Sequence, residues 1–174
     1  MLFERALGIM ERTHGPDHTE LSWPLTSLGW NLTRQKRFDE ARTFHERSIR
    51  LIETQLGPEH PRMVPALDGL GAMYWRMGRY EDSRPLGERA LVIRENEVGR
   101  EHADVARRYY NLACIWAKVG EREEAMDKLR QAIDRGFSWG GIADDPDLDS
   151  LRGDPEFEAI VDEIEGRGGN PLVR

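Results

Sequence analysis

The stretch GPEH at residues 57–60 decides the fold, because the same element stands 42 residues earlier and 42 residues later. The earlier copy is GPDH at residues 15–18, and the later copy is GREH at residues 99–102. A constant repeat length of this size is typical of a solenoid, in which each structural unit stacks on the next. Solenoids commonly hold a partner along an extended surface. The period therefore predicts a class of function without naming the partner.

Charge and cysteine content narrow the function classes. The 174 residues carry a formal net charge of -7, which argues against general affinity for nucleic acid or anionic membranes. The single cysteine, Cys114, excludes an internal disulfide and suits a reducing compartment. No stretch reaches the length of a membrane span, and Met1 opens directly into a charged helix. We therefore expect a cytoplasmic protein.

Each unit of the period contains two helices. Leu67, Leu70 and Tyr74 follow helical spacing, and Leu86, Ala90 and Ile93 trace a second helix. A glycine between them, at residue 78, is a typical helix stop. Small residues recur at positions 29, 71 and 113, where two helix backbones would need to approach closely. The unit is thus predicted to be a helix–turn–helix pair.

The Leu-Gly pair at 70–71, Tyr74 and the run GRYEDSRPL at 78–86 resemble the tetratricopeptide repeat (TPR), in its 42-residue kinesin-light-chain-type subclass. The resemblance implies an all-α fold: a right-handed α-solenoid of antiparallel helix pairs, the TPR superhelix, with a C-terminal capping loop and helix. The sequence departs from the pattern at three places. Lys36 replaces a turn glycine, Arg122 replaces an aromatic residue, and Gly87 lies inside a helix.

The period sets the expected boundaries. Residues 1–14 form the second helix of an incomplete repeat, and complete repeats cover 19–56, 61–98 and 103–137. A C-terminal cap follows at 138–166 and a flexible tail at 167–174. Because Met1 starts within a unit, one side of the first helix is expected to be bare at Leu2, Ala6, Leu7, Ile9 and Met10. A short helix is expected over Glu156–Glu165. The cap residues expected to cover the last repeat are Trp139, Ile142, Leu148, Leu151, Phe157, Ile160 and Val161.

Metal binding and catalysis find little support. His18, His60 and His102 lie in successive units, at least about 8 to 10 Å apart, so they cannot share one ion. We instead expect each to form hydrogen bonds in the turn before a helix. The acids Asp145, Asp147, Asp149 and Glu156 imitate calcium-loop spacing, but Ser150 replaces the glycine that such a loop needs. Cys114 has no base at a motif spacing. We expect no metal, no cofactor and no enzyme activity.

The resemblance implies that the first helix of each pair lines a concave peptide-binding groove. Arg34, Arg76 and Lys118 recur at the full period and predict a basic row along one edge. Asn111 stands where such grooves often use asparagine to hold peptide backbone. The alternative is that the tryptophans belong partly to the core and the basic row is solvated. The predicted groove residues are Trp23, Thr26, Trp30, Thr33, Arg34, Asp68, Ala72, Trp75, Arg76, Arg107, Tyr110, Asn111, Cys114 and Lys118.

Two functions fit this reading. The first is a non-enzymatic protein–protein interaction module that binds a peptide or partner helix, acidic and with bulky apolar residues, in the groove. The second is a C-terminal regulatory or assembly segment of a larger signalling protein with an NTPase or kinase domain. The second is suggested by the bare face of the first helix, through which a further contact is expected. No nucleic acid or membrane partner is expected in either case.

Overall fold

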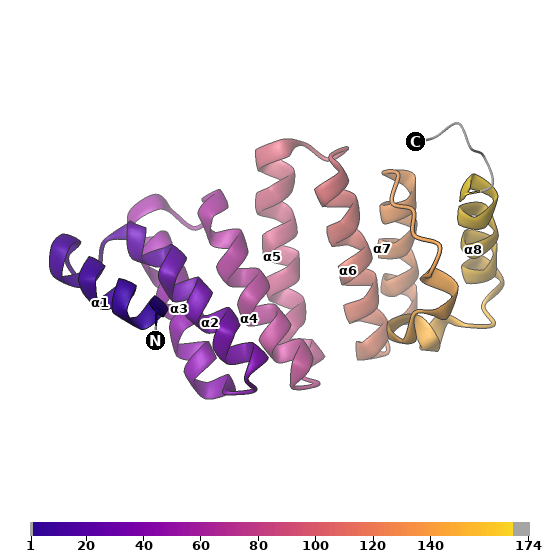
Figure 1. Cartoon of the computed structure of the whole chain (residues 1–174). Helices are drawn as coiled ribbons and strands as arrows, with labels where there is room; N and C mark the ends of the chain where they lie inside the picture. The colour runs from indigo at the N-terminus through magenta and orange to yellow at the C-terminus, as the bar shows by residue number, and fades with distance from the viewer. Residues whose placement is uncertain (1, 169–174) are drawn as a thin grey trace. The chain divides into compact units, whose positions relative to one another are not determined.

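The computed structural model describes residues 2–168, and every regular element in this range is helical (Figure 1). The chain divides between Glu97 and Val98 into two compact units, which we call unit 1 and unit 2. The predicted all-α fold of antiparallel helix pairs is confirmed. Met1 and most of the predicted tail, residues 169–174, lie outside the described residues. No helix within residues 2–168 combines the length and the apolar character that a bilayer crossing requires.

Unit 1 consists of a single helix followed by two helix pairs, each introduced by a short 3-10 helix. The last helix ends one residue beyond the unit boundary. Its elements are α1 (Leu2–His14), η1 (Thr19–Leu21), α2 (Ser22–Arg34), α3 (Phe38–Leu56), η2 (Pro61–Met63), α4 (Val64–Arg76) and α5 (Tyr80–Val98).

Unit 2 consists of one helix pair and the C-terminal cap. The cap helix is longer at its C-terminal end than the short helix expected from the sequence. The elements are α6 (Ala103–Val119), α7 (Arg122–Asp134), η3 (Ile142–Asp144), η4 (Pro146–Leu151) and α8 (Pro155–Gly168).

The repeated glycine–histidine element builds the turns between pairs. The glycines at 15, 57 and 99 all have a positive φ, which L side chains rarely adopt. The imidazole Nδ1 of His18 accepts a hydrogen bond from the backbone N–H of residue 20 at 3.2 Å. His60 and His102 do the same for residues 62 and 104, at 3.2 and 3.1 Å. The predicted turn role of the three histidines is confirmed, and each one caps the start of the next helix.

Arginines join successive second helices in unit 1. Arg47 of α3 pairs with Glu11 of α1 at 2.7 Å and donates to the Pro16 carbonyl at 2.9 Å. Arg89 of α5 repeats both contacts one period later, with Glu53 at 2.6 Å and the Pro58 carbonyl at 2.8 Å. Each arginine thus connects its own helix to the preceding second helix. It also binds the turn that follows that preceding helix.

Apolar side chains fill the spaces between the helices of unit 1. Leu7 of α1 is buried against Leu21, Leu25 and Leu51, and Met10 packs on the same cluster. The bare side expected at Leu7 is therefore wrong, Ala6 and Met10 are half-buried, and Ile9 is exposed, at 55%. The side chain of Leu2 lies outside the described residues.

A buried histidine holds three helices of unit 1 together. The ring of His45, on α3, lies against Gly29 of α2 and Gly69 of α4. A Cβ atom added at Gly29 would lie 2.6 Å from the ring, and one at Gly69 would lie 2.2 Å from it. The small residue at 29 was expected to let two backbones approach. Its more specific role is to make room for this imidazole.

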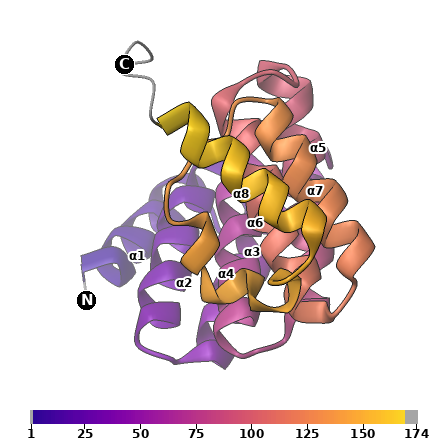
Figure 2. The same ribbon diagram turned by 90° about the vertical axis from the view of Figure 1, so that its right-hand side faces the viewer.

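The C-terminal cap closes unit 2. The 3-10 helix η4 packs on α6, while α8 packs on α7 (Figure 2). Arg122, one of the three departures from the family pattern, anchors the cap by donating to the Ser150 carbonyl at 3.2 Å and pairing with Asp154. The expected cap residues are buried with one exception, since Trp139 is 47% exposed. The buried ones are Ile142, Leu148, Leu151, Phe157, Ile160 and Val161.

Candidate peptide-binding surface

In unit 1 the predicted groove residues lie on α2 and α4, which pack on each other. We call the solvent-accessible ones among them, which are Trp23, Trp30, Arg34, Asp68, Ala72, Trp75 and Arg76, the first-helix surface. Trp23 is 69% exposed at the start of α2. Arg34 and Arg76 are exposed at the last residues of α2 and α4, and neither forms an ion pair within residues 2–168.

The other tryptophans of this surface are half-buried. Trp30 contacts the His45 ring edge-on, with the ring centroids 6.2 Å apart. Trp75 makes a similar edge contact with Tyr80 of α5 at 4.8 Å. Each tryptophan is thus fixed by a neighbouring ring while part of its surface stays accessible. Aromatic groups held in this way can contact a ligand at a low entropy cost, because their rotamers are already restricted.

Two predicted residues of α2 belong to the packed interior instead. Thr26 is buried, and its hydroxyl lies 2.9 Å from that of Ser48 on α3. Thr33 is fully buried. Their expected place on an open surface is therefore wrong. Small hydroxyl side chains fit at the close contact of α2 and α3, and helical periodicity alone does not distinguish such positions from neighbouring open ones.

The predicted ligand-binding residues of α6, in unit 2, fall into an exposed group and a buried group. Arg107 and Asn111 are exposed, and Arg107 pairs with Asp104 on its own helix. Tyr110 and Cys114 are buried, which corrects their expected place on an open surface. Burial, followed by the charge of nearby Asp145, raises the pKa of the Cys114 thiol to about 12. A thiol in this state is not a nucleophile at neutral pH.

The C-terminal segment covers the second group. The Tyr110 ring stacks on Phe137 at a centroid distance of 4.4 Å and meets Trp139 edge-on at 6.0 Å. Its hydroxyl donates to the carboxylate of Asp145. Burial, followed by this hydrogen bond, raises the pKa of the tyrosine well above its ordinary value.

Lys118, the third member of the predicted basic row, is also engaged by this segment. Its ammonium donates to the Pro146 carbonyl at 2.7 Å and lies 3.3 Å from the Asp147 carboxylate. The basic row is therefore not uniform. Arg34 and Arg76 are exposed, whereas Lys118 is bound within the chain. Nothing in the 42-residue period could have indicated this, because the segment that binds Lys118 has no counterpart in the repeats.

The acidic cluster of the cap has internal partners. The two oxygens of Asp145 accept from the Tyr110 hydroxyl and, at 2.9 Å, from the backbone N–H of Asp147. Asp149 pairs with Arg152 at 2.9 Å. These contacts account for the acids as groups that fix the cap. Within residues 2–168 no three metal-ligating side chains come together to hold an ion.

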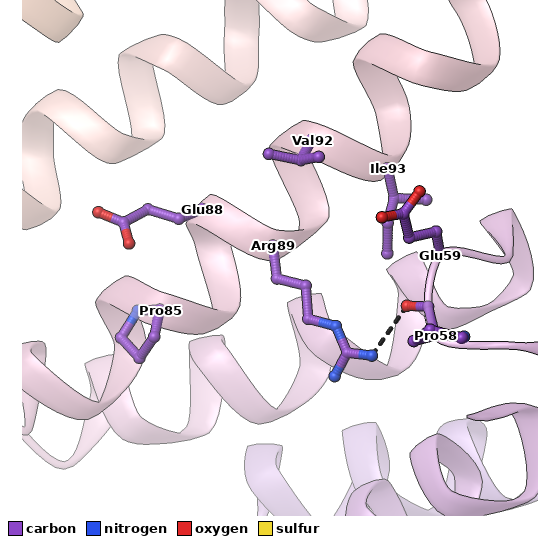
Figure 3. Close-up of a pocket in the computed structure, with 7 residues that line it drawn as sticks. All are labelled: Pro58, Glu59, Pro85, Glu88, Arg89, Val92 and Ile93. Carbon is purple, nitrogen blue, oxygen red and sulfur yellow. Dashed lines mark hydrogen bonds between the residues drawn. The ribbon is translucent and has the colours of Figure 1, made fainter. Parts of the chain in front are cut away.

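One hollow of unit 1 was not anticipated from the sequence. It has a volume of about 400 Å³ and lies between α5 and the turn before η2 (Figure 3). Arg89 crosses it to reach the Pro58 carbonyl, and Val92 on its rim is 49% exposed. The remaining lining residues are Glu59, Pro85, Glu88 and Ile93. The hollow follows from the arginine contact between repeats, and it brings together no catalytic or metal-binding set.

Comparison with known proteins supports the sequence resemblance. A family model described as tetratricopeptide repeat matches residues 1–54, 31–91 and 62–135. No curated protein matches the sequence.

Solved structures share the fold at low identity. The crystal structure of BtubC (BKLC) from P. vanneervenii matches with a TM-score of 0.70 at 19% identity, covering 79% of this chain and 57% of that one. A kinesin-light-chain-like protein of Podosopora anserina with nearly identical TPR-like repeats matches with a TM-score of 0.75 at 18% identity. That match covers 97% of this chain and 86% of the other. The chain thus spans little more than half the length of BtubC.

Proposed function

The chain belongs to the tetratricopeptide repeat family, whose members are generally protein-interaction modules, and from this we propose that its first-helix surface binds a peptide or a partner helix. The proposed ligand carries acidic residues beside bulky apolar ones. The observation that carries the proposal is the exposure of Arg34 and Arg76 at equivalent ends of two packed helices, on a surface that also bears tryptophans.

The charge of the two arginines favours an acidic ligand. Their guanidinium groups have no carboxylate partner within residues 2–168, although the protein as a whole is acidic. A ligand carboxylate can pair with either group in two parallel hydrogen bonds, which fixes its orientation as well as its charge. Because both groups are exposed, we expect them to contribute more to the association rate and specificity than to the final affinity.

The tryptophans favour bulky apolar residues beside the acids. Trp23, Trp30 and Trp75 present indole surface on the same two helices. Aromatic anchors of this kind commonly contribute most of the binding energy at an interface, while surrounding polar contacts select the partner. The proposed role is therefore capture by several contacts, without chemistry on the ligand.

Charge reversal tests the proposal. The variant Arg34→Glu with Arg76→Glu is compared with Arg42→Glu with Arg50→Glu, which changes the net charge equally but lies on α3. The probes are short synthetic peptides that combine a tryptophan with several acidic residues, together with the same peptides carrying lysine in place of the acids. We expect the wild type to prefer the acidic set. We also expect the first variant to bind this set about tenfold or more weakly, chiefly through slower association, while the α3 variant keeps the wild-type affinity.

Salt dependence gives a second readout. Binding through Arg34 and Arg76 should weaken as the salt concentration rises, because exposed charge pairs are screened. Equal binding by wild type and the Arg34/Arg76 variant, with the fold intact by circular dichroism, would show that these arginines do not hold the ligand.

A further inference from the structure

The cap segment is held by α6 in the manner of a bound peptide. Residues 139–151 contact α6 through carboxylates, a backbone carbonyl and an aromatic ring. Tyr110 holds the Asp145 carboxylate, and Lys118 holds both the Pro146 carbonyl and the Asp147 carboxylate. The segment therefore has the composition proposed for the ligand of unit 1, with acidic residues beside a bulky aromatic one.

The position of this segment in the repeat pattern is as informative as its chemistry. Lys118 lies one period after Arg76 and two periods after Arg34. The residue that binds the segment is therefore the unit 2 counterpart of the two exposed arginines. The segment contacts Tyr110 and Lys118 and brings the Asp145 charge close to the buried Cys114, while Phe137, just before the segment, stacks on the Tyr110 ring. Arg107 and Asn111 on the same helix stay exposed.

We infer that residues 139–151 are a displaceable internal occupant of a peptide-binding face on α6, and that a ligand reaches Tyr110, Cys114 and Lys118 only by displacing them. This inference rests on the proposed function, since it assumes that first helices of the pairs bind peptides. The inference adds a form of regulation to the proposed function. While residues 139–151 are bound to α6, the first-helix surface of unit 1 is accessible to a ligand and the corresponding face of α6 is not.

Two sets of contacts of the segment make the inference testable, while Ser150 is held separately by Arg122 and by the Ala117 carbonyl. Polar contacts with Tyr110 and Lys118 hold the part that covers the predicted ligand residues. Leu148 and Leu151, by contrast, are fully buried and hold η4 in place. Loss of the polar set should loosen the segment, while loss of a leucine should release it more completely.

A mild variant tests loosening first. Tyr110→Phe keeps the ring that stacks on Phe137 but removes the hydroxyl, and Asp147→Asn removes the ion pair with Lys118. Hydrogen exchange of the amides at 144–152 should accelerate about tenfold in the double variant, because two polar contacts are lost. The amides of α7 should keep their wild-type rates. The matched control for the charge change is Asp149→Asn, which lies in the same segment but pairs with Arg152.

Addition of the segment as a separate peptide tests displacement. The probe is a synthetic peptide with the sequence of residues 139–152. The receiving chain carries Asp145→Ala and Leu148→Ala, which weaken its own segment. Wild type should bind the probe at least about tenfold more weakly than this opened chain, because its own copy is held at a high effective concentration. The further change Lys118→Glu in the opened chain should abolish most of the gain.

The outcomes separate this inference from the proposed function. Failure of the probe to bind an opened chain whose α6 and α7 remain protected would overturn the inference, as would unchanged exchange at 144–152 in the mild variant. Complete loss of α6 and α7 protection in the opened chain, beyond the acceleration that the cavity at Leu148 itself causes, would also overturn it, because the segment would then be an inseparable part of unit 2. None of these results involves Arg34 or Arg76, so the proposed function of unit 1 stands or falls separately.

Discussion

Unit 1 and unit 2 carry the same helix pair, but different structures stabilise them and their first helices have different surroundings. Unit 1 is held by the buried His45 and by arginine contacts between second helices, and the ends of α2 and α4 are exposed. Unit 2 is held by its cap, which covers part of α6. Equivalent positions of one repeat can thus be available to a partner or used by the chain itself. The 42-residue period alone does not distinguish the two.

The largest effect should come from the core of the cap. Leu148 is fully buried where η4 packs on α6, so Leu148→Ala removes apolar contacts and leaves a cavity. We expect a loss of about 2 to 5 kcal/mol in the stability of unit 2. Hydrogen exchange measures this in the amides of α6 and α7, while the amides of α2 to α4 should be unaffected. Equal acceleration in both units would contradict the separate stabilisation described above.

Acid should affect unit 1 through His45. Burial lowers the pKa of this imidazole to about 4, from an ordinary value of 6.5. The Gly29 backbone opposes part of this shift, although neither ring nitrogen completes a hydrogen bond within the described residues. The unfolded chain therefore binds a proton below pH 6.5 that the folded chain does not bind until about pH 4. Stability should fall as the pH is lowered through this window, by about 3 kcal/mol in total, and His45 should contribute no further loss below it.

The control for this prediction comes from the chain itself. Leu129 stands two periods after His45, so His45→Leu introduces a residue that the repeat already uses at this position. Chemical denaturation between pH 7 and pH 4, followed by exchange in unit 1, should show the slope in the wild type and its reduction in the variant. An equal slope in both proteins would assign the acid sensitivity to other groups.

A smaller loss should follow from filling the space beside the same ring. A Cβ at Gly69 would lie 2.2 Å from His45, whereas one at Gly71 would find its nearest neighbour at 3.6 Å. Gly69→Ala should therefore cost about 1 to 3 kcal/mol. Gly71→Ala should be neutral or stabilise by up to about 1 kcal/mol, because alanine is the better helix former. Thermal unfolding of both variants measures the difference, and equal midpoints would show that the His45 ring does not limit the space at residue 69.

The period predicted the helix pairs and the turn role of the histidines, because these properties depend on local spacing and polarity. The burial of Leu148 and Phe157, beyond the last repeat, was predicted instead from the resemblance of the C-terminal segment to the ends of other TPR arrays. It did not predict that Thr26 and Thr33 are buried, since that depends on which side of α2 faces α3. The role of His45 had a signal that was missed. His45 and Gly69 contact each other across two helices, and each has an equivalent position one period later. The equivalent of His45 is Gly87, and the equivalent of Gly69 is Asn111. This exchange of large and small residues indicates a size-matched position.

The turn between α2 and α3 provides the smallest of the expected effects. Lys36 has a φ of 61°, the left-handed conformation that Gly78 adopts at 71° in the next pair. A non-glycine residue in this conformation costs roughly 1 to 2 kcal/mol of folding stability, which a change to glycine would remove. Glycine also loses more conformational entropy on folding, and this offsets part of the stabilisation. Lys36→Gly should therefore stabilise unit 1 by about 0.5 to 1 kcal/mol, and Gly78→Lys should destabilise it by a similar amount. Urea unfolding of the two variants should show shifts of opposite sign. The reversed pattern, in which Lys36→Gly destabilises and Gly78→Lys stabilises, would mean that the lysine side chain, rather than the backbone conformation, determines the stability of this turn.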